Sequence, residues 1–472
     1  MTHRPNLKFT LAVAAAMAGA GLILSGPISV RADVGTAIPA ADTTVSLDST
    51  TAPATPAPVP DTHPLLMYSL DKMPDATGST VGQDLQNMGI NIYGYLEAGY
   101  TTSFQGTPKP TYAGRVFDTE YGNHLQLDQL DLSVEKAINF SDPAFRKRGW
   151  DIGGKMEWLY GYDASLIHSN GLNFYHDWNN NTNQYPLYQF DLEQAYVDFA
   201  VPVGKDGGLR LRIGKFDTLL GEETINPTTN YFYSHSFEFG YAIPFTNTGI
   251  MAEYIMNSQW SFWAGITRGW NQSLRDNNSA IDFMGEATYT PTSEWTLTAN
   301  VIAGPEDNNN DTYYRTVLDL IASWNPAHIL GGNLTLVNDT DFGYDGAGGT
   351  LASEEATEGE TSLDGDEGSV QSAGWFATAF YASYNINSYL QANARAEYYY
   401  DGKSFTTGLA NGTNLDLGEI TLGMTITPFP DSNLGKNLRF RPEIREDMAD
   451  QPVFQNGKHY QTTIGMDVIY TF

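Results

Sequence analysis

Charged side chains at alternate positions of polar–apolar segments are the residues in this sequence best suited to act on a solute. The basic ones are Arg210, Arg212, Arg395, Arg439, Arg441 and Arg445. The acidic ones are Glu97, Glu157, Asp198 and Glu397. If both sets line one aqueous space, they create a transverse field that selects and orients charged solutes. The alternative is that they only pair with one another and fill a lumen wall, and both roles can coexist.

The stretch 219–247 is the most distinctive segment, because it mixes polar groups with many aromatic residues. Its polar candidates are Glu222, Glu223, Asn226, Asn230 and His235. Its aromatic residues include Tyr231, Phe232, Tyr233, Phe237, Phe239 and Tyr241. A solvated loop would not need so many aromatic side chains, so one hypothesis is that the segment folds into a barrel and narrows its pore. The alternative is an outer loop that packs against neighbouring loops or another subunit.

Patterns that signal catalysis or tight metal binding are weak. The sequence has no phosphate-binding loop ending in Lys-Ser or Lys-Thr, and Ser234-His235-Ser236 are adjacent loop residues that do not form a triad. The acidic run from Glu354 to Glu367 offers hard oxygen ligands for Ca²⁺ or Mg²⁺. Its spacing does not match the twelve-residue calcium loop, which favours an external loop that attracts cations loosely. We therefore expect no enzyme, no cofactor and no metal site.

The elements that must position these residues are segments of roughly ten or more residues with a period of two. Alternation of this kind places successive side chains on opposite faces of a strand. Many apolar faces end in Tyr or Trp, which is typical of the aromatic girdles of a membrane barrel, whereas strands of a soluble sandwich are shorter. The candidate strands lie near 91–104, 125–137, 151–163, 192–203, 208–218, 248–257, 259–270, 281–290, 294–304, 313–324, 332–342, 372–385, 389–401, 415–428, 437–447 and 459–472.

The predicted fold is therefore all-β: a transmembrane, antiparallel, up-and-down barrel of about sixteen strands over residues 90–472. Short joins such as Gly207-Gly208, Asn257-Ser258 and Pro291-Thr292-Ser293 fit turns on the periplasmic side. Longer stretches, 105–124, 164–190, 219–247, 271–280, 343–371 and 402–414, fit external loops. Short and long connections do not alternate cleanly in this assignment, so some boundaries must differ.

The first 89 residues differ from the rest in composition and lack the period of two. Residues 1–32 are typical of a secretory signal, with Arg4 and Lys8 before an apolar stretch and cleavage expected near Ala32; a single membrane anchor is the alternative. Residues 33–63 are rich in Pro, Ala and Thr and indicate a flexible linker. Residues 64–89 can form one or two short helical turns at the mouth or rim of the barrel.

Composition narrows the possible functions. The net charge is −30 in 472 residues, which makes nucleic acid a poor partner because phosphates would be repelled. The absence of cysteine excludes disulfides, zinc–thiolate sites and thiol catalysis. After the signal segment no apolar run is long enough for a membrane-spanning helix, which takes about 18 residues or more.

Several runs resemble the outer-membrane family called putative β-barrel porin-2, or OmpL-like. The opening segment Asn91-Ile92-Tyr93-Gly94-Tyr95-Leu96-Glu97-Ala98-Gly99-Tyr100 resembles the first strand of that family. The longest similarity runs through Arg212–Thr218, Ile225–Asn230, Tyr233–Ser236 and Ile243–Gly249. Shorter runs, Gly114–Asp118 and Leu127–Leu132, are similar too. The resemblance spans the whole barrel and implies a porin, without catalytic residues to transfer.

Together these patterns predict a bacterial outer-membrane porin for passive diffusion of small hydrophilic solutes or ions. The alternatives are a binding or structural barrel with a closed lumen and adhesin or receptor loops, and an outer-membrane hydrolase. Expected partners are outer-membrane lipid, the barrel-assembly machinery that reads the last strand ending in Phe472, and further copies of the chain in a homotrimer. The last strand should pair with the first near Ile92–Tyr100 to close the ring.

Overall fold

The structure of the protein is a computed structural model that describes residues 65–75, 78–105, 117, 123–172, 187–205, 207–346 and 372–472. The predicted signal segment 1–32, the linker 33–63 and the acidic run 354–367 lie outside the described residues.

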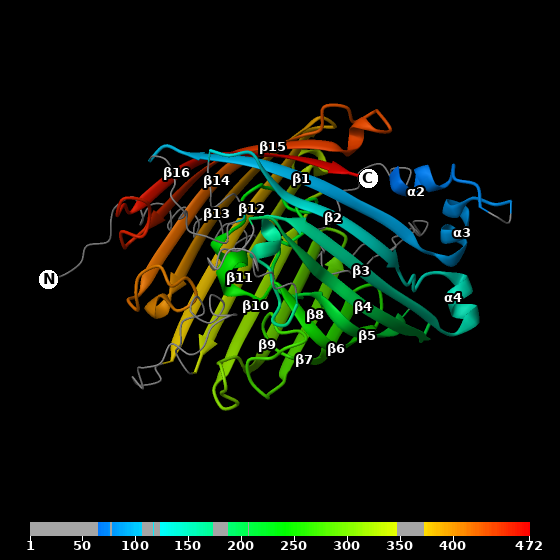
Figure 1. Cartoon of the computed structure of the whole chain (residues 1–472), viewed down its shortest axis with the longest axis horizontal. Helices are drawn as coiled ribbons and strands as arrows, with labels where there is room; N and C mark the ends of the chain where they lie inside the picture. The colour runs from blue at the N-terminus through cyan, green and yellow to red at the C-terminus, as the bar shows by residue number, and fades with distance from the viewer. Residues whose placement is uncertain are drawn as a thin grey trace, which may run out of the picture.

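The described residues form sixteen strands in one closed, antiparallel barrel, in which each strand pairs with its neighbours in sequence (Figure 1). This confirms the predicted fold class and strand number. The strands are β1 Asn91–Ser103, β2 Gln126–Lys136, β3 Asp151–Gly161, β4 Gln189–Val203, β5 Gly207–Asp217, β6 Thr246–Ile255, β7 Trp260–Thr267, β8 Asp282–Thr292, β9 Trp295–Pro305, β10 Tyr314–Trp324, β11 Leu334–Asp345, β12 Ala373–Asn387, β13 Leu390–Asp401, β14 Leu415–Ile426, β15 Leu438–Ala449 and β16 Tyr460–Thr471.

The ring closes between β1 and β16. Tyr95 lies opposite Thr471 and Ser103 lies opposite Thr463 in an unbroken antiparallel register. Beyond β16, the Phe472 N–H donates to the Gly94 carbonyl at 2.9 Å, and the Gly94 N–H donates to the Phe472 carbonyl at 3.0 Å. The predicted pairing of the last strand with the first is thus confirmed, and no edge strand is left in the sheet.

Connections alternate between two ends of the barrel. The terminal end, where β1 begins and β16 ends, carries residues 137–150, 204–206, 256–259, 293–294, 325–333, 388–389 and 427–437. At the loop end, β1, β3, β5, β7, β9, β11, β13 and β15 end and the strand that follows each of them begins. The sequence assignment left short and long connections in uneven alternation and therefore predicted that some boundaries differ, which the structure confirms: residues 306–313 and 450–459 are further connections at the loop end. Gly207 and Gly208 were also misassigned, since both lie inside β5.

The barrel has charged side chains on the inside and apolar side chains on the outside, the reverse of a soluble protein. On β15 the charged side chains of Arg441, Glu443 and Arg445 are buried inside the ring, whereas Ile444 points outward and is 44% exposed. This arrangement is what a lipid-facing barrel requires. Trp295 on β9 stacks on Trp324 of β10 with ring centroids 5.3 Å apart at the terminal end, as in an interfacial aromatic girdle.

Three short helices lie at the terminal end (Figure 1). Helices α2 (Leu65–Leu70) and α3 (Val81–Met88) precede β1, and α4 (Pro143–Arg148) joins β2 to β3. The Thr80 hydroxyl caps the start of α3 by accepting from the Gln83 N–H, and Gly89 ends it in the left-handed conformation. Within the described part of the chain, no helix is long and apolar enough to cross a membrane.

Candidate pore constriction inside the barrel

Residues 218–245, which join β5 to β6 and are called the inner loop below, fold into the barrel and reach strands on its far side. The Gly221 N–H donates to Asp319 Oδ2 on β10 at 2.8 Å, and the Glu222 N–H donates to Asp339 Oδ2 on β11 at 2.7 Å. These strands are separated from β5 by four or more strands around the ring. The loop therefore crosses the interior.

Carboxylates of the wall accept from the backbone of the inner loop farther along. Glu397 on β13 accepts from the N–H groups of Phe237 and Glu238, at 2.8 and 2.5 Å. Glu443 on β15 accepts from the Tyr233 N–H at 2.9 Å and from that of Ser234 at 3.2 Å. Backbone N–H groups removed from water need such partners, and ionised acceptors form the stronger bonds.

Arginines of β15 bind the carbonyl groups of the inner loop in the same way. Arg441 donates from Nη1 to the carbonyls of Pro227 and Asn230, both at 2.9 Å. Arg445 donates to the His235 carbonyl at 2.5 Å. Arg439 donates to the carbonyl of Thr228 at 3.0 Å. The wall thus forms hydrogen bonds with both the N–H groups and the carbonyl groups of the loop backbone.

Arg395 on β13 makes the densest link between the inner loop and the wall. Its Nη1 donates to Glu223 Oε1 at 2.6 Å and to the Ser234 carbonyl at 2.8 Å, both in the inner loop. Its Nε donates to Glu419 Oε1 on β14 at 2.5 Å. The guanidinium also lies 5.0 Å from the ring of Phe232, within cation–π range.

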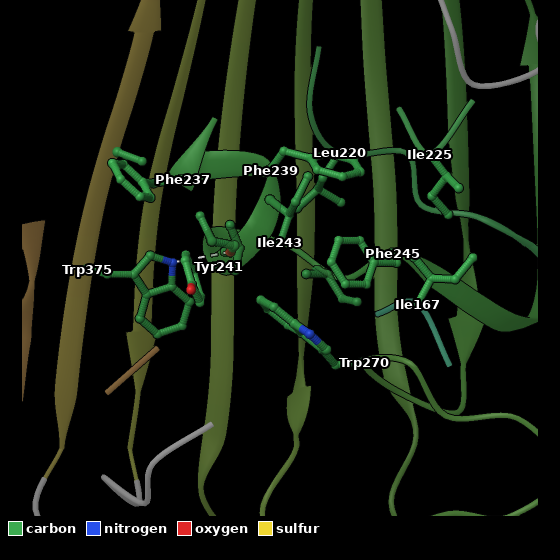
Figure 2. Packing of buried hydrophobic residues seen from close by; sticks show 14 of the residues in the cluster. Ile167, Leu220, Ile225, Phe237, Phe239, Tyr241, Ile243, Phe245, Trp270 and Trp375 are labelled. Atoms are coloured by element: carbon green, nitrogen blue, oxygen red, sulfur yellow. Dashed lines mark hydrogen bonds between the residues drawn. The ribbon is translucent and has the colours of Figure 1, made fainter. Parts of the chain in front are cut away.

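Apolar side chains of the inner loop pack with residues of the wall and of other loops inside the barrel. Figure 2 shows Phe239, Ile243 and Phe245 gathered near Trp270 and Trp375. The Trp375 indole N–H donates to the Ala242 carbonyl at 3.2 Å, so the polar edge of this ring is satisfied as well.

Wall glycines make room for two aromatic side chains of the inner loop. A Cβ on Gly99 of β1 would lie 2.1 Å from the Tyr233 hydroxyl oxygen. A Cβ on Gly423 of β14 would lie 3.1 Å from the Phe232 ring. The absence of a side chain at these two positions of β1 and β14 therefore lets the loop pack closely against the wall.

The sequence-predicted wall residues all face the interior, but they lie in separate groups. Those in contact with the inner loop or with a wall residue that binds it are Glu97, Arg395, Glu397, Arg439, Arg441 and Arg445. Asp198, Arg210 and Arg212 instead form an ion-pair cluster with Glu253 on β4, β5 and β6. Glu157 pairs with Lys155 at 2.9 Å.

The predicted loop residues divide between binding the wall and folding the loop itself. Glu223 accepts from the Ser236 N–H at 2.7 Å besides pairing with Arg395. Asn230 accepts from the Thr224 N–H and contacts the His235 ring at 2.8 Å. Asn226 accepts from the Thr228 N–H, and Glu222 is half-buried beside Asp339. Together these bonds close residues 224–235 into a compact lobe.

Sequence reasoning missed several wall residues that hold the loop: Asp319, Asp339, Glu419 and Glu443. Their alternate spacing could have identified them, since Glu443 lies two positions from both Arg441 and Arg445. The spacing does not say which of these residues a loop will reach.

Charge is unevenly distributed around the interior. Strands β8 to β11 carry one buried arginine, Arg315, among the inward carboxylates Asp282, Glu286, Asp319, Asp339, Asp341 and Asp345. The inward arginines 395, 439, 441 and 445 all lie on β13 and β15. The same side also carries the buried carboxylates Glu397, Asp401, Glu419, Glu443 and Asp447, so the inner loop lies between an acidic wall and a wall of mixed charge.

Burial lowers the pKa of His235 to about 4, against the opposing attraction of Glu223. The ring is therefore neutral in the docked loop at neutral pH and gains a proton more readily when the loop is released, where the ordinary pKa is 6.5. The stability that neutral His235 contributes is present above pH 6.5 and is lost as the pH falls toward 4.

We expect acidification to loosen the inner loop through His235. Between pH 7 and 4, wild-type protein should lose up to about 3 kcal/mol more free energy of unfolding than His235→Gln, whose amide stays neutral. Urea unfolding of both proteins at a series of pH values measures the difference. Parallel pH profiles would show that His235 does not couple docking to protons.

A family model described as "Putative beta-barrel porin-2, OmpL-like" matches residues 89–472 of the chain. No curated protein sequence matches significantly.

Solved outer-membrane barrels are similar in structure. They include the outer-membrane channel DcaP of Acinetobacter baumannii, with 11% identity, a TM-score of 0.48 and coverage of 81% of this chain and 97% of that one. The anion-selective porin of Comamonas acidovorans has 10% identity and a TM-score of 0.47, covering 81% and 99%. OprB of Pseudomonas putida has 11% identity and a TM-score of 0.47, covering 83% and 96%.

Proposed function

Because the chain belongs to the putative beta-barrel porin-2, OmpL-like family, we propose that it is a passive pore for small hydrophilic solutes or ions, narrowed by the inner loop. As a member of this family it is a channel protein of the outer membrane. The proposal adds the passive mechanism, the solute class and the place where passage is limited.

The observation that carries the proposal is the attachment of the inner loop between two charged walls. Arg395, Glu397 and Glu443 bind it on one side of the interior, and Asp319 and Asp339 bind it on the other. A loop attached on both sides sets the free cross-section, and charged side chains around it favour hydrated solutes over apolar ones. No cofactor and no chemical step are required for this function.

The remaining features of the proposal concern export and assembly. Residues 1–32 would direct export and be cleaved near Ala32, and residues 33–63 would link the mature N-terminus to the barrel. The outward apolar belt would contact lipid, and the last strand ending in Phe472 would be read by the barrel-assembly machinery. A homotrimer is proposed by analogy with porins of this size.

Purified protein in planar lipid bilayers tests the function directly. We expect discrete, stable conductance steps that scale with salt concentration. A reversal potential measured across a salt gradient then reports the sign of the preferred ion. A membrane that contains folded barrels and stays silent would contradict the pore.

One observation favours a second candidate, a closed barrel with a binding or structural role. Apolar side chains from several loops, including Ile167, Phe245, Trp270, Phe405 and Phe454, form one cluster inside the barrel. Such packing would exclude water if it spanned the lumen. The same bilayer measurement separates the candidates, because a closed barrel gives no steps.

A further inference from the structure

Three carboxylates on neighbouring strands converge inside the barrel. Asp131 on β2, Glu157 on β3 and Glu193 on β4 each offer an oxygen, and these oxygens all lie within 4.8 Å of one another. None of these three residues is more than 1% exposed. Like charges brought this close in a buried place repel strongly unless something offsets them.

A β-bulge brings the third carboxylate into the cluster. Across the β3–β4 ladder Glu157 pairs with Gln194 and Trp158 pairs with Leu192, so Glu193 is the extra residue between them. As a result Glu193 and Gln194, although adjacent in sequence, are both buried toward the interior. A regular strand would have turned one of them to the lipid side.

Glu193 also lacks hydrogen-bond donors. Neither of its carboxylate oxygens has a partner among the described residues, although the side chain is fully buried. Glu157, in contrast, accepts from Ser133 Oγ at 3.0 Å, from Gln194 Nε2 at 2.6 Å and from Lys155 Nζ at 2.9 Å. A buried carboxylate without donors is costly, which points to a further positive group at this place.

The local charge shows how large that group must be. With all three carboxylates ionised, they and the ammonium of Lys155 leave 3 − 1 = 2 negative charges in the cluster. A divalent cation neutralises both. The donors are oxygens only, without His or Cys, and this set suits a hard cation rather than zinc or copper.

We propose that Asp131, Glu157 and Glu193 form a divalent-cation site that prefers Ca²⁺. Calcium accepts six to eight oxygen ligands in a flexible arrangement, whereas Mg²⁺ demands near-octahedral geometry and keeps more of its water. Asp131 and Glu193 offer the oxygens least engaged elsewhere, and Glu157 shares its charge with Lys155. The proposal departs from the prediction from sequence that no metal is bound, and it does not rest on the proposed function.

Calcium binding to the folded protein tests the site. Protein in detergent micelles is freed of metal with a chelator and titrated with CaCl₂ by calorimetry, as wild type, Glu193→Gln and Glu286→Gln. Glu286 is an inward glutamate of β8 outside the cluster, so its amide variant controls for the loss of one interior charge. We expect Glu193→Gln to weaken this binding by about tenfold or more, because the number of charged ligands tunes calcium affinity. Glu286→Gln should bind as wild type does.

Thermal unfolding gives a second readout that a mere folding defect cannot imitate. Without divalent ions, Glu193→Gln should unfold at a higher temperature than wild type, because an uncompensated buried charge is gone. With Ca²⁺ wild type should show the larger rise in unfolding temperature, because it binds the ion more tightly. Equal responses of wild type and Glu193→Gln to Ca²⁺ would overturn the proposal. So would wild-type stabilisation by acid with no response to Ca²⁺, since protons would then hold the carboxylates.

Discussion

Deletion of residues 224–236 should raise the single-channel conductance of the protein severalfold. This segment carries the inner loop across the interior, and its removal leaves Arg439, Arg441 and Glu443 facing water instead of loop backbone. The ends of the deletion lie close together, because Glu223 accepts from the Ser236 N–H at 2.7 Å and the His235 ring contacts the Thr224 carbonyl at 3.0 Å. The join should therefore not strain β5 or β6.

Single-channel recordings of the deletion variant beside wild type measure this effect. Circular dichroism and the heat-dependent migration typical of folded barrels serve as controls for assembly. An unchanged conductance in a folded variant would mean that the inner loop does not limit passage, and the constriction would have to be sought at another place.

Replacement of Arg395 by Met should cost about 3–5 kcal/mol of unfolding free energy, the range for a buried ion pair that loses one partner. The substitution leaves Glu223 and Glu419 buried without their shared cation and leaves the Ser234 carbonyl without its donor. The inner loop should also lose one of its links to β13 and keep those through Glu397, so current through the open pore should become noisier.

Two companion variants identify the cause of that loss. Arg395→Lys keeps the charge but cannot reach three acceptors with a planar fork, so it should lie between wild type and Arg395→Met. Adding Glu223→Gln and Glu419→Gln to Arg395→Met should restore part of the stability, because the uncompensated charges are then removed. If Arg395→Met unfolds with the midpoint of wild type, the ion-pair network does not hold the loop.

The strands could be predicted from sequence because lipid on one side and water or polar groups on the other impose a period of two. All sixteen strands were predicted. Their ends were wrong by a few residues, because the conformation of the adjoining turn residues sets where a strand stops. The strand β7 stops at Thr267, not at 270, because Gly269 takes a φ of 117° and redirects the chain into the loop end. Bulges were not predictable, since Glu193 breaks the period only through its pairing with β3.

The inner loop was recognised by its aromatic residues, but its partners could not be predicted. Tyr233 and Glu443 are 210 positions apart, and nothing in local spacing brings them together. The wall position of Glu443 follows from alternation, whereas its bond to the loop depends on how far the chain reaches across a closed ring. Separate ion pairs such as Asp198 with Arg212 belong to the same alternating pattern and were therefore grouped with the loop-binding residues.

The attachment of the inner loop has a consequence for the order of events during assembly. Residues 218–245 come before every strand from β10 to β16, yet Asp319, Arg395, Glu443 and Arg445 on those strands hold them. The loop inside the barrel is thus encoded near the middle of the chain and docked among the last steps. Contacts between distant parts of a chain form slowly. A freshly inserted barrel should accordingly pass through a stage in which the inner loop is not yet docked.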